Sequence, residues 1–246
     1  MKTHDALFIG GAPRQVSAAD VSGEYVTLFD ESFYCIRHYD AMPPFFMTLI
    51  SSSDHWMFIS TTGGLTAGRK DANHALFPYY TVDRITENHE NTGSMSLIRV
   101  TRSEHTSLWE PFSDRYRGLY RTERNVYKNI PGTTLIFEEI NHDLALRFRY
   151  AWRTSPEYGF VRTSWIANLS PDACTAEVLD GLQNVLPAYV TAQTQNEFSV
   201  LLNAYKRSEV DPATGLGLFA LSSRLTDLAE PSESLRANTI WHVGLD

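Results

Sequence analysis

The densest group of polar side chains that could contact a ligand lies between residues 63 and 84. Guanidinium, imidazole and carboxylate groups hydrogen-bond hydroxyl groups, and the flat faces of tyrosine rings stack on sugar rings. We expect this segment to form one wall of a surface groove. The simpler alternative is that its charged groups only pair with one another inside a loop. The candidate ligand contacts are Arg69, His74, Tyr79, Asp83 and Arg84.

The glycines of this segment come close to a nucleotide-binding loop. Four residues separate Gly63 from Gly68, but Arg69 and Lys70 stand where such a loop has a lysine followed by a magnesium-binding serine or threonine. Pro78 follows too soon to leave room for a helix whose N-terminus would hold phosphates. The segment therefore predicts a hairpin turn in which the glycines supply positive φ between two strands.

Two adjacent carboxylates, Glu138 and Glu139, lie within a strand pattern. Neighbouring side chains of a strand point to opposite faces, so these two cannot act together as an acid–base pair. We expect both carboxylates to be solvated. The alternative is that one of them faces a concave sheet surface and acts as a general base. His142 lies in a turn and is expected to be exposed or structural.

Trp109 completes the set of candidate ligand contacts, although it and Trp152 are more readily explained as core anchors. No Ser-His-Asp arrangement can be recognised, so no catalytic residue is predicted. The histidines show no metal-binding spacing, and neither a metal nor a cofactor is expected. The histidines concerned are His38, His55, His74, His89 and His105.

The composition is that of a folded globular protein with no nucleic-acid partner. The chain has 246 residues, of which 43% are hydrophobic, enough for one large domain or two small ones. The net charge is −8, and the basic residues form no stripe. Cys35 and Cys174 match no zinc or redox spacing and are expected to be buried free thiols in a reducing compartment.

The N-terminus lacks the charged and apolar regions of an export signal, and no apolar run is long enough to cross a membrane. We therefore expect a cytoplasmic protein without a membrane partner.

Most of the chain has the pattern of short strands separated by Gly, Pro, Ser or Asp. The clearest is LALRFRYAW, in which Leu144, Leu146, Phe148 and Tyr150 would face one side and the arginines the other. Residues 141–143 predict a turn between two long strands. The predicted strands lie in 24–30, 33–40, 45–52, 55–62, 133–140, 144–152 and 158–170.

The C-terminal third is less regular. Residues 176–187 suit a strand followed by a helical turn, and 198–210 suit either a helix or a hairpin, of which we favour the strands. Residues 231–246 look like a loop that enters a further strand, so we expect the natural chain to continue past Asp246. These patterns predict a single all-β domain over residues 1–246, an antiparallel β-sandwich with two large sheets.

The order of several segments resembles the N-terminal domain of glycoside phosphorylases of the cellobiose and chitobiose phosphorylase type. The resemblance covers roughly residues 33–190 and departs from the family at Leu65, where the family has an aromatic residue, and at Val100, where it has Asp. The corresponding segments are MPPFFMTLISS (42–52), STTGGLTAG (60–68), HALFPYYTVDRI (74–85), SLIRV (96–100), LWEPF (108–112), 132–152 and 160–186.

In that family the N-terminal domain is a large β-sandwich similar to galactose mutarotase, and the catalytic acid lies in a following helical barrel. The resemblance therefore implies a carbohydrate-associated domain that is not catalytic alone, within a larger enzyme of carbohydrate metabolism. The implied partners are a sugar or oligosaccharide and the helical barrel domain. A second copy of the chain, forming a homodimer, is a further alternative. Two alternatives are a free-standing aldose 1-epimerase-like enzyme and a structural sandwich without a ligand.

Overall fold

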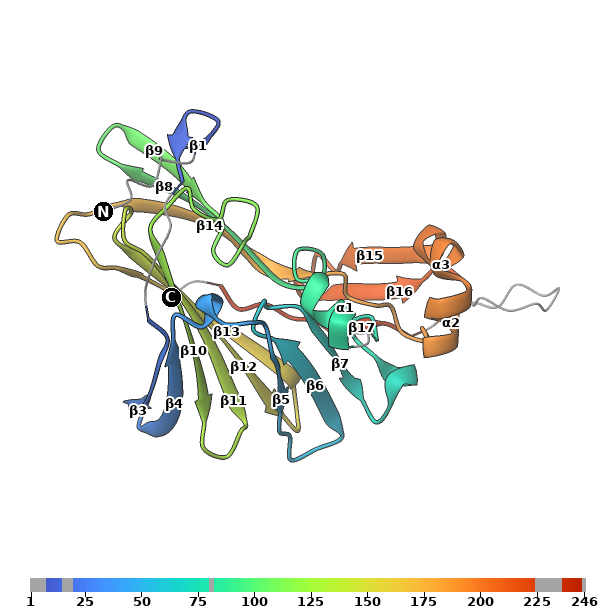
Figure 1. The fold of residues 1–246 in the computed structure, drawn as a ribbon. Coiled ribbons are helices and arrows are strands. Elements are labelled where there is room, and N and C mark those ends of the chain that lie inside the picture. The colour runs from blue at the N-terminus through green and yellow to red at the C-terminus, as the bar shows by residue number, and fades with distance from the viewer. Residues whose placement is uncertain (1–7, 15–19, 80–81, 224–235, 245–246) are drawn as a thin grey trace.

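The computed structural model describes residues 8–14, 20–79, 82–223 and 236–244, and it is mostly β (Figure 1). Every strand pair in it is antiparallel. The predicted all-β class is confirmed. Among the described residues, no helix is long and apolar enough to cross a membrane.

One layer of the fold is a six-stranded sheet with the strand order β13-β12-β11-β10-β4-β3. In β12 the side chains of Leu146, Phe148 and Tyr150 are buried on one face, while Arg147 and Arg149 lie on the other, as the alternation predicted. The strands are β3 (Ser22–Leu28), β4 (Glu31–Arg37), β10 (Thr122–Asn129), β11 (Thr134–Asn141), β12 (Leu146–Ser155) and β13 (Gly159–Asn168).

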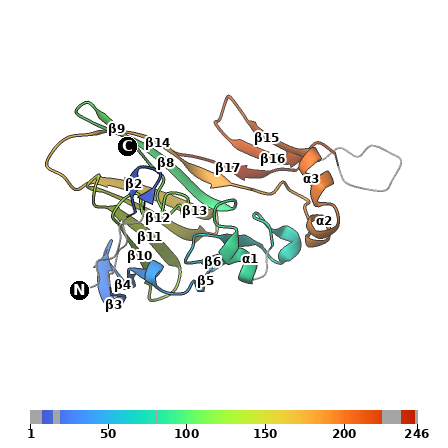
Figure 2. The same cartoon turned by 45° about the horizontal axis from the view of Figure 1, so that its top comes forward.

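The facing layer consists of two three-stranded sheets, β5-β6-β7 and β14-β8-β9. The sequence predicted one large sheet in each layer, so this layer differs from the prediction. Seen with the top of the molecule turned towards the viewer, β8 and β14 lie across β12 and β13 (Figure 2). Ile59, Ile98, Phe137 and Phe148 from both layers belong to one buried core. The strands are β5 (Phe46–Leu49), β6 (His55–Ser60), β7 (Leu65–Arg69), β8 (Gly93–Arg102), β9 (His105–Trp109) and β14 (Thr175–Gln183).

The glycine segment forms the β6–β7 hairpin, as predicted, but only one of its glycines is there for positive φ. Gly63 has φ +94° in the turn. A Cβ on Gly64 would lie 2.0 Å from the backbone oxygen of Ile85, and one on Gly68 would lie 2.6 Å from that of His74. Gly64 and Gly68 are thus explained by close backbone packing.

The C-terminal third forms a separate end of the molecule (Figure 1). A sheet of β15 (Lys206–Val210), β16 (Gly217–Leu221) and β17 (Asn238–Ile240) adjoins α2 (Ala192–Glu197) and α3 (Ser199–Tyr205). The favoured strand over 198–205 is wrong, because α3 buries Leu202 in a small cluster with Val190 and Leu221.

Several smaller features complete the fold. The helical turn predicted after β14 is absent, since residues 184–190 are irregular. Cys35 is buried, as expected, whereas Cys174 is only partly buried, and both are free thiols. The remaining elements are β1 (Phe8–Ile9), β2 (Ala12–Pro13), η1 (Tyr39–Ala41), η2 (Ala72–His74) and α1 (Val82–Glu87).

Candidate functional site

A polar pocket lies where the β6–β7 turn, the start of β8, the end of β14 and the loops around residues 90 and 111 meet over β12. Its cavity volume is about 30 Å³, which is room for about two water molecules. It is lined by Thr62, Gly63, His89, Glu90, Ser94, Met95, Ser96, Glu110, Pro111, Phe112, Ser113, Tyr150 and Gln183.

A network of one buried and one partly buried ion pair supports one side of the pocket. Arg124, 8% exposed, donates from Nε to Glu139 Oε2 at 2.7 Å and from Nη1 to Asp114 Oδ1 at 3.1 Å. Glu139 also accepts hydrogen bonds from Trp109 Nε1 and the Phe112 amide, both at 2.8 Å. These bonds join β9, β10 and β11 to the loop that carries the pocket residues 110–113.

His89 contacts the same network of ion pairs through Asp114. Its Nε2 lies 3.2 Å from Asp114 Oδ2, in ion-pair contact but without the alignment of a hydrogen bond. The Asp114 carboxylate raises the pKa of His89, and burial opposes this only in part. His89 in turn holds the pKa of Asp114 well below its usual range. The imidazole therefore tends to be charged at the pocket wall.

A second, partly buried pair supports the opposite side. Arg162 donates to both oxygens of Asp180, at 2.7 and 2.9 Å, and its guanidinium lies 4.9 Å from the centre of the Tyr150 ring. Asp180 also accepts hydrogen bonds from Ser96 and Ser164. Burial would raise the pKa of Asp180, but these donors, Arg162 first, lower it.

Glu110 differs from the other carboxylates around the pocket. Glu90 pairs with Arg115 at 3.0 Å and accepts from the Asp114 amide at 2.7 Å, so its charge is balanced. In the described part of the chain, Glu110 makes no ion pair. Burial raises its pKa, and the nearby charge of Arg115 and a hydrogen bond from the Ser113 side chain oppose this in part. A carboxylate has about four acceptor sites, so Glu110 can accept a further donor from outside.

The pocket thus offers a ligand hydroxyl groups, an amide and, among the described residues, one carboxylate without an ion pair, which are the partners that sugar hydroxyls use. No three His, Cys, Asp or Glu side chains are grouped to hold a metal ion in the ranges that the structure describes. Hydrogen bonding to a small uncharged group is the chemistry that fits.

Neither a family model nor a curated protein matches the chain. The function is therefore inferred from the pocket and from the segments that line it.

Most of the predicted contacts lie away from this pocket. The length of β7, about 13 Å, separates Arg69 from the Gly63 turn. Arg69 makes two 3.1 Å hydrogen bonds to Asp54, which lies outside the segment 63–84. His74 contacts Asp71 at 2.8 Å, so the alternative that charged groups pair inside the loop is confirmed for His74. Arg84 is exposed at the end of α1, whereas the side chain of Asp83 lies outside the described residues.

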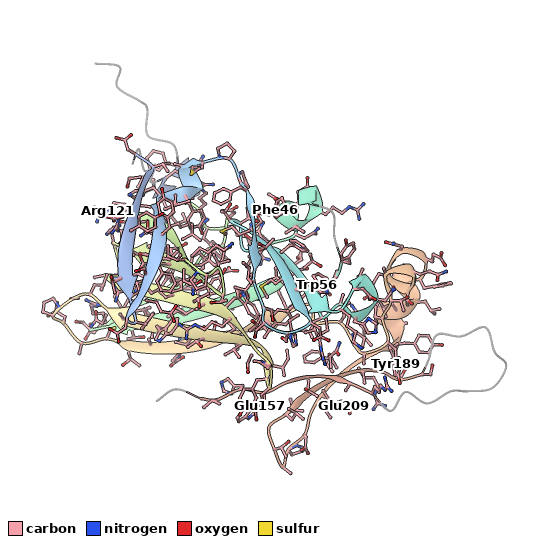
Figure 3. The ribbon with its side chains drawn as sticks, turned by 90° about the horizontal axis from the view of Figure 1, so that it is seen from below. Phe46, Trp56, Arg121, Glu157, Tyr189 and Glu209 are labelled. Atoms are coloured by element: carbon pink, nitrogen blue, oxygen red, sulfur yellow. The ribbon has the colours of Figure 1, made fainter. Side chains whose placement is uncertain are left out.

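Tyr79 and Trp109 have different surroundings. Tyr79 is 50% exposed and ends a row of rings with Trp56, Phe58 and Phe46 on the outer face of β5-β6-β7, two of which are labelled in Figure 3. Their tilted and edge-on contacts leave no flat platform. Trp109 is 2% exposed, so the core-anchor alternative is confirmed for it.

Glu138 and Glu139 do point to opposite faces, but the expectation that they are solvated is wrong. Each is 2% exposed. Glu138 accepts hydrogen bonds from Asn125, Tyr127 and Arg149, which together lower its pKa against the effect of burial. The epimerase alternative needs a glutamate that is free to act as a base, and Glu138 already accepts three hydrogen bonds.

The pocket residues that matter most were not selected from the sequence. Glu110 lies in LWEPF and Gly63 in STTGGLTAG, so the segments were recognised while the carboxylate was not. His89 lies in the loop after α1, Tyr150 in β12 and Gln183 in β14. No local spacing could bring them together, because contact between them depends on how the two layers stack.

Titration of the histidines tests the electrostatics of the pocket. His89 should titrate above the usual value of 6.5 and His55, whose pKa burial lowers, below it. Because the folded-state pKa of His89 is raised, its contribution to stability is complete below pH 6.5 and is lost as pH rises through the folded-state pKa. Proton NMR of the imidazole ring measures both values.

The Asp114→Asn variant should lower the pKa of His89 and leave that of His55 unchanged. A His89 resonance that titrates identically in the variant would show that Asp114 does not control it.

Proposed function

We propose that this chain is a carbohydrate-associated β-sandwich domain that binds a sugar at the polar pocket and does not cleave it. The observation that carries the proposal is the composition of the pocket wall. Thr62 and Gly63 come from STTGGLTAG, Ser96 from SLIRV and Glu110 from LWEPF. Three of the segments whose order resembles the glycoside phosphorylase N-terminal domain thus meet around one cavity.

The size of the cavity limits how a sugar would bind. A volume of about 30 Å³ is too small for a sugar ring but suits one or two hydroxyl groups in place of water. The ring would lie across the opening, with a hydroxyl donating to Glu110. Such limited burial predicts weak binding, in the millimolar range of roughly −4 kcal/mol.

The carboxylates support binding rather than hydrolysis. Glycoside hydrolysis uses two carboxyl groups on either side of the scissile bond. Around the pocket, Glu90 and Glu139 are both held by arginines, which leaves Glu110 as the available one within the described residues. In the resembled family the catalytic acid also lies in a different domain.

Titration of the protein with glucose, cellobiose and chitobiose, followed by NMR of the sugar signals, tests this proposal. We expect saturable binding of at least one sugar. Glu110→Gln should weaken it about tenfold, because hydrogen bonds to a charged acceptor contribute roughly 1.5–3 kcal/mol. The matched control is Glu157→Gln, an exposed glutamate on the turn before β13 (Figure 3).

Absence of binding up to the solubility limit of all three sugars would contradict the proposal, as would equal affinity of the Glu110→Gln and parent proteins. Release of monosaccharide in proportion to the amount of purified protein would overturn its non-catalytic part.

A further inference from the structure

The charged groups around the polar pocket can be counted in pairs. Four cations line the pocket or belong to the ion pairs that support it, and each has its own carboxylate. The pairs are His89 with Asp114 at 3.2 Å, Arg115 with Glu90 at 3.0 Å, and Arg124 with Glu139 and Arg162 with Asp180, both at 2.7 Å. Among the described residues, Glu110 is the carboxylate left over. The pocket wall therefore has one negative charge in excess when His89 is protonated, and a larger excess when it is neutral.

Arg115 reduces this excess without cancelling it. Its Nε lies 3.0 Å from Glu90 Oε2, and it also attracts the Glu110 carboxylate, with which it forms no ion pair. One guanidinium therefore serves two carboxylates, and its side chain is 52% exposed, so water screens its charge. The Ser113 hydroxyl that also contacts Glu110 is neutral and adds no charge.

Neutral side chains of the pocket turn their donors towards the protein. Thr62 donates to a backbone oxygen of α1 at 3.0 Å, and Ser96 donates to the Asp180 carboxylate. The Gln183 side-chain nitrogen donates to the backbone oxygen of Glu90 at 3.0 Å. The remaining hydrogen-bonding capacity of these three side chains therefore lies mainly in acceptor oxygens.

A wall rich in acceptors and with an excess negative charge favours a cationic donor. A primary ammonium group has three N–H donors and no acceptor. Hydrogen bonds between ionised groups are roughly twice as strong as those between neutral ones. A sugar hydroxyl could also donate to Glu110, but it would leave the excess charge uncompensated. An ammonium group balances the charge and uses the acceptors at the same time.

The size of the cavity selects among amino groups. Its volume of about 30 Å³ has room for about two water molecules, and an ammonium group is similar to one water molecule in size. An acetamido group has four non-hydrogen atoms and does not fit into this volume. The cavity therefore suits the free amine of an amino sugar, with the sugar ring across the opening, and not its N-acetylated form.

We propose that the polar pocket is specific for an amino sugar, whose protonated amino group enters the cavity and pairs with Glu110. This inference rests on the proposed sugar-binding function and names the class of sugar that the same site takes. Glu110 is then the residue that determines specificity. The oxygens of Thr62, Ser96 and Gln183 are the neutral acceptors for the remaining donors of the ligand.

Titration of the protein with glucosamine, glucose and N-acetylglucosamine at about pH 6.5, where the free amine is protonated, tests the specificity. We expect glucosamine to bind about tenfold more tightly than glucose, because its bond to Glu110 is between two charged groups. N-acetylglucosamine should bind no more tightly than glucose.

Variants of one residue assign the preference to its charge. Glu110→Gln keeps the shape of the side chain but not its charge, and it should bind glucosamine and glucose equally. Glu110→Asp keeps the charge and should retain a preference for glucosamine. The matched control is Glu157→Gln at an exposed position, which should keep the tenfold preference of the parent (Figure 3).

NMR of the Glu110 carboxyl carbon separates direct pairing from an indirect effect of the substitutions. Burial raises the pKa of Glu110 in the free protein. Saturating glucosamine should lower this pKa, because a nearby ammonium group favours the charged carboxylate, and glucose should lower it less.

The outcomes distinguish this inference from the proposed function. Equal affinities of the parent protein for glucosamine and glucose would overturn the amino-sugar specificity and leave sugar binding at the pocket in place. A tenfold preference that persists in Glu110→Gln, or a pKa of Glu110 that glucosamine leaves unchanged, would overturn the assignment to Glu110. Absence of binding for all three sugars would contradict both the inference and the proposed function.

Discussion

The Glu139→Ala variant should lose about 3–5 kcal/mol of unfolding free energy, because it leaves a buried arginine without its main partner. Arg124 is 8% exposed and makes its shortest hydrogen bond, 2.7 Å, to Glu139. The substitution also removes the acceptor of Trp109 Nε1 and of the Phe112 amide. Urea unfolding followed by tryptophan fluorescence measures the loss.

Two matched variants interpret the result. Glu177→Ala removes a carboxylate that also pairs with an arginine, Arg99, but at an exposed position, and it should leave the unfolding midpoint unchanged. Replacing both partners with apolar residues, Arg124→Met with Glu139→Leu, should be less destabilising than Glu139→Ala alone. A Glu139→Ala protein as stable as the parent would show that the pair does not hold β9, β10 and β11 together.

The Gly64→Ala variant should be destabilised by about 1–3 kcal/mol, the usual cost of forcing extra atoms into packed structure. The new Cβ would lie 2.0 Å from the backbone oxygen of Ile85, so the end of α1 or the β6–β7 turn must move. Gly63 lines the pocket next to this position. Sugar binding should therefore weaken together with stability.

Gly181→Ala is the matched control, since a Cβ there meets nothing within 4 Å, and it should be as stable as the parent or slightly more stable. Thermal unfolding of both variants followed by circular dichroism makes the comparison. If Gly64→Ala unfolds at the temperature of Gly181→Ala, the close contact between Gly64 and Ile85 is not a constraint on the fold.

Strand patterns predicted the central sheet because alternation is a local property. Leu146, Phe148 and Tyr150 are apolar in every second position, and each is buried on the same face. The error at α3 has a local reason too. Leu202 and Tyr205 have helical spacing, but the hairpin of β15 and β16 that follows favoured strands for the whole run.

The pocket could not be predicted in the same way, because it depends on stacking of distant segments. Alternation places Glu138 and Glu139 on opposite faces, yet it does not reveal that Trp109 and Phe112 cover one of them. The density of charge between residues 63 and 84 drew attention to Arg69, which instead pairs with Asp54. Charge density along a sequence does not distinguish a ligand contact from an ion pair.

Chemical-shift mapping of the backbone amides with cellobiose and chitobiose tests the sugar proposal most directly. The account predicts that saturating sugar moves the signals of Gly63, Ser96, Glu110 and Gln183, which line the pocket, and leaves those of Arg69 and His74 in place. Shifts confined to Arg69, His74 and Tyr79, with the pocket signals unmoved, would contradict it and place any sugar contact at the far end of β7.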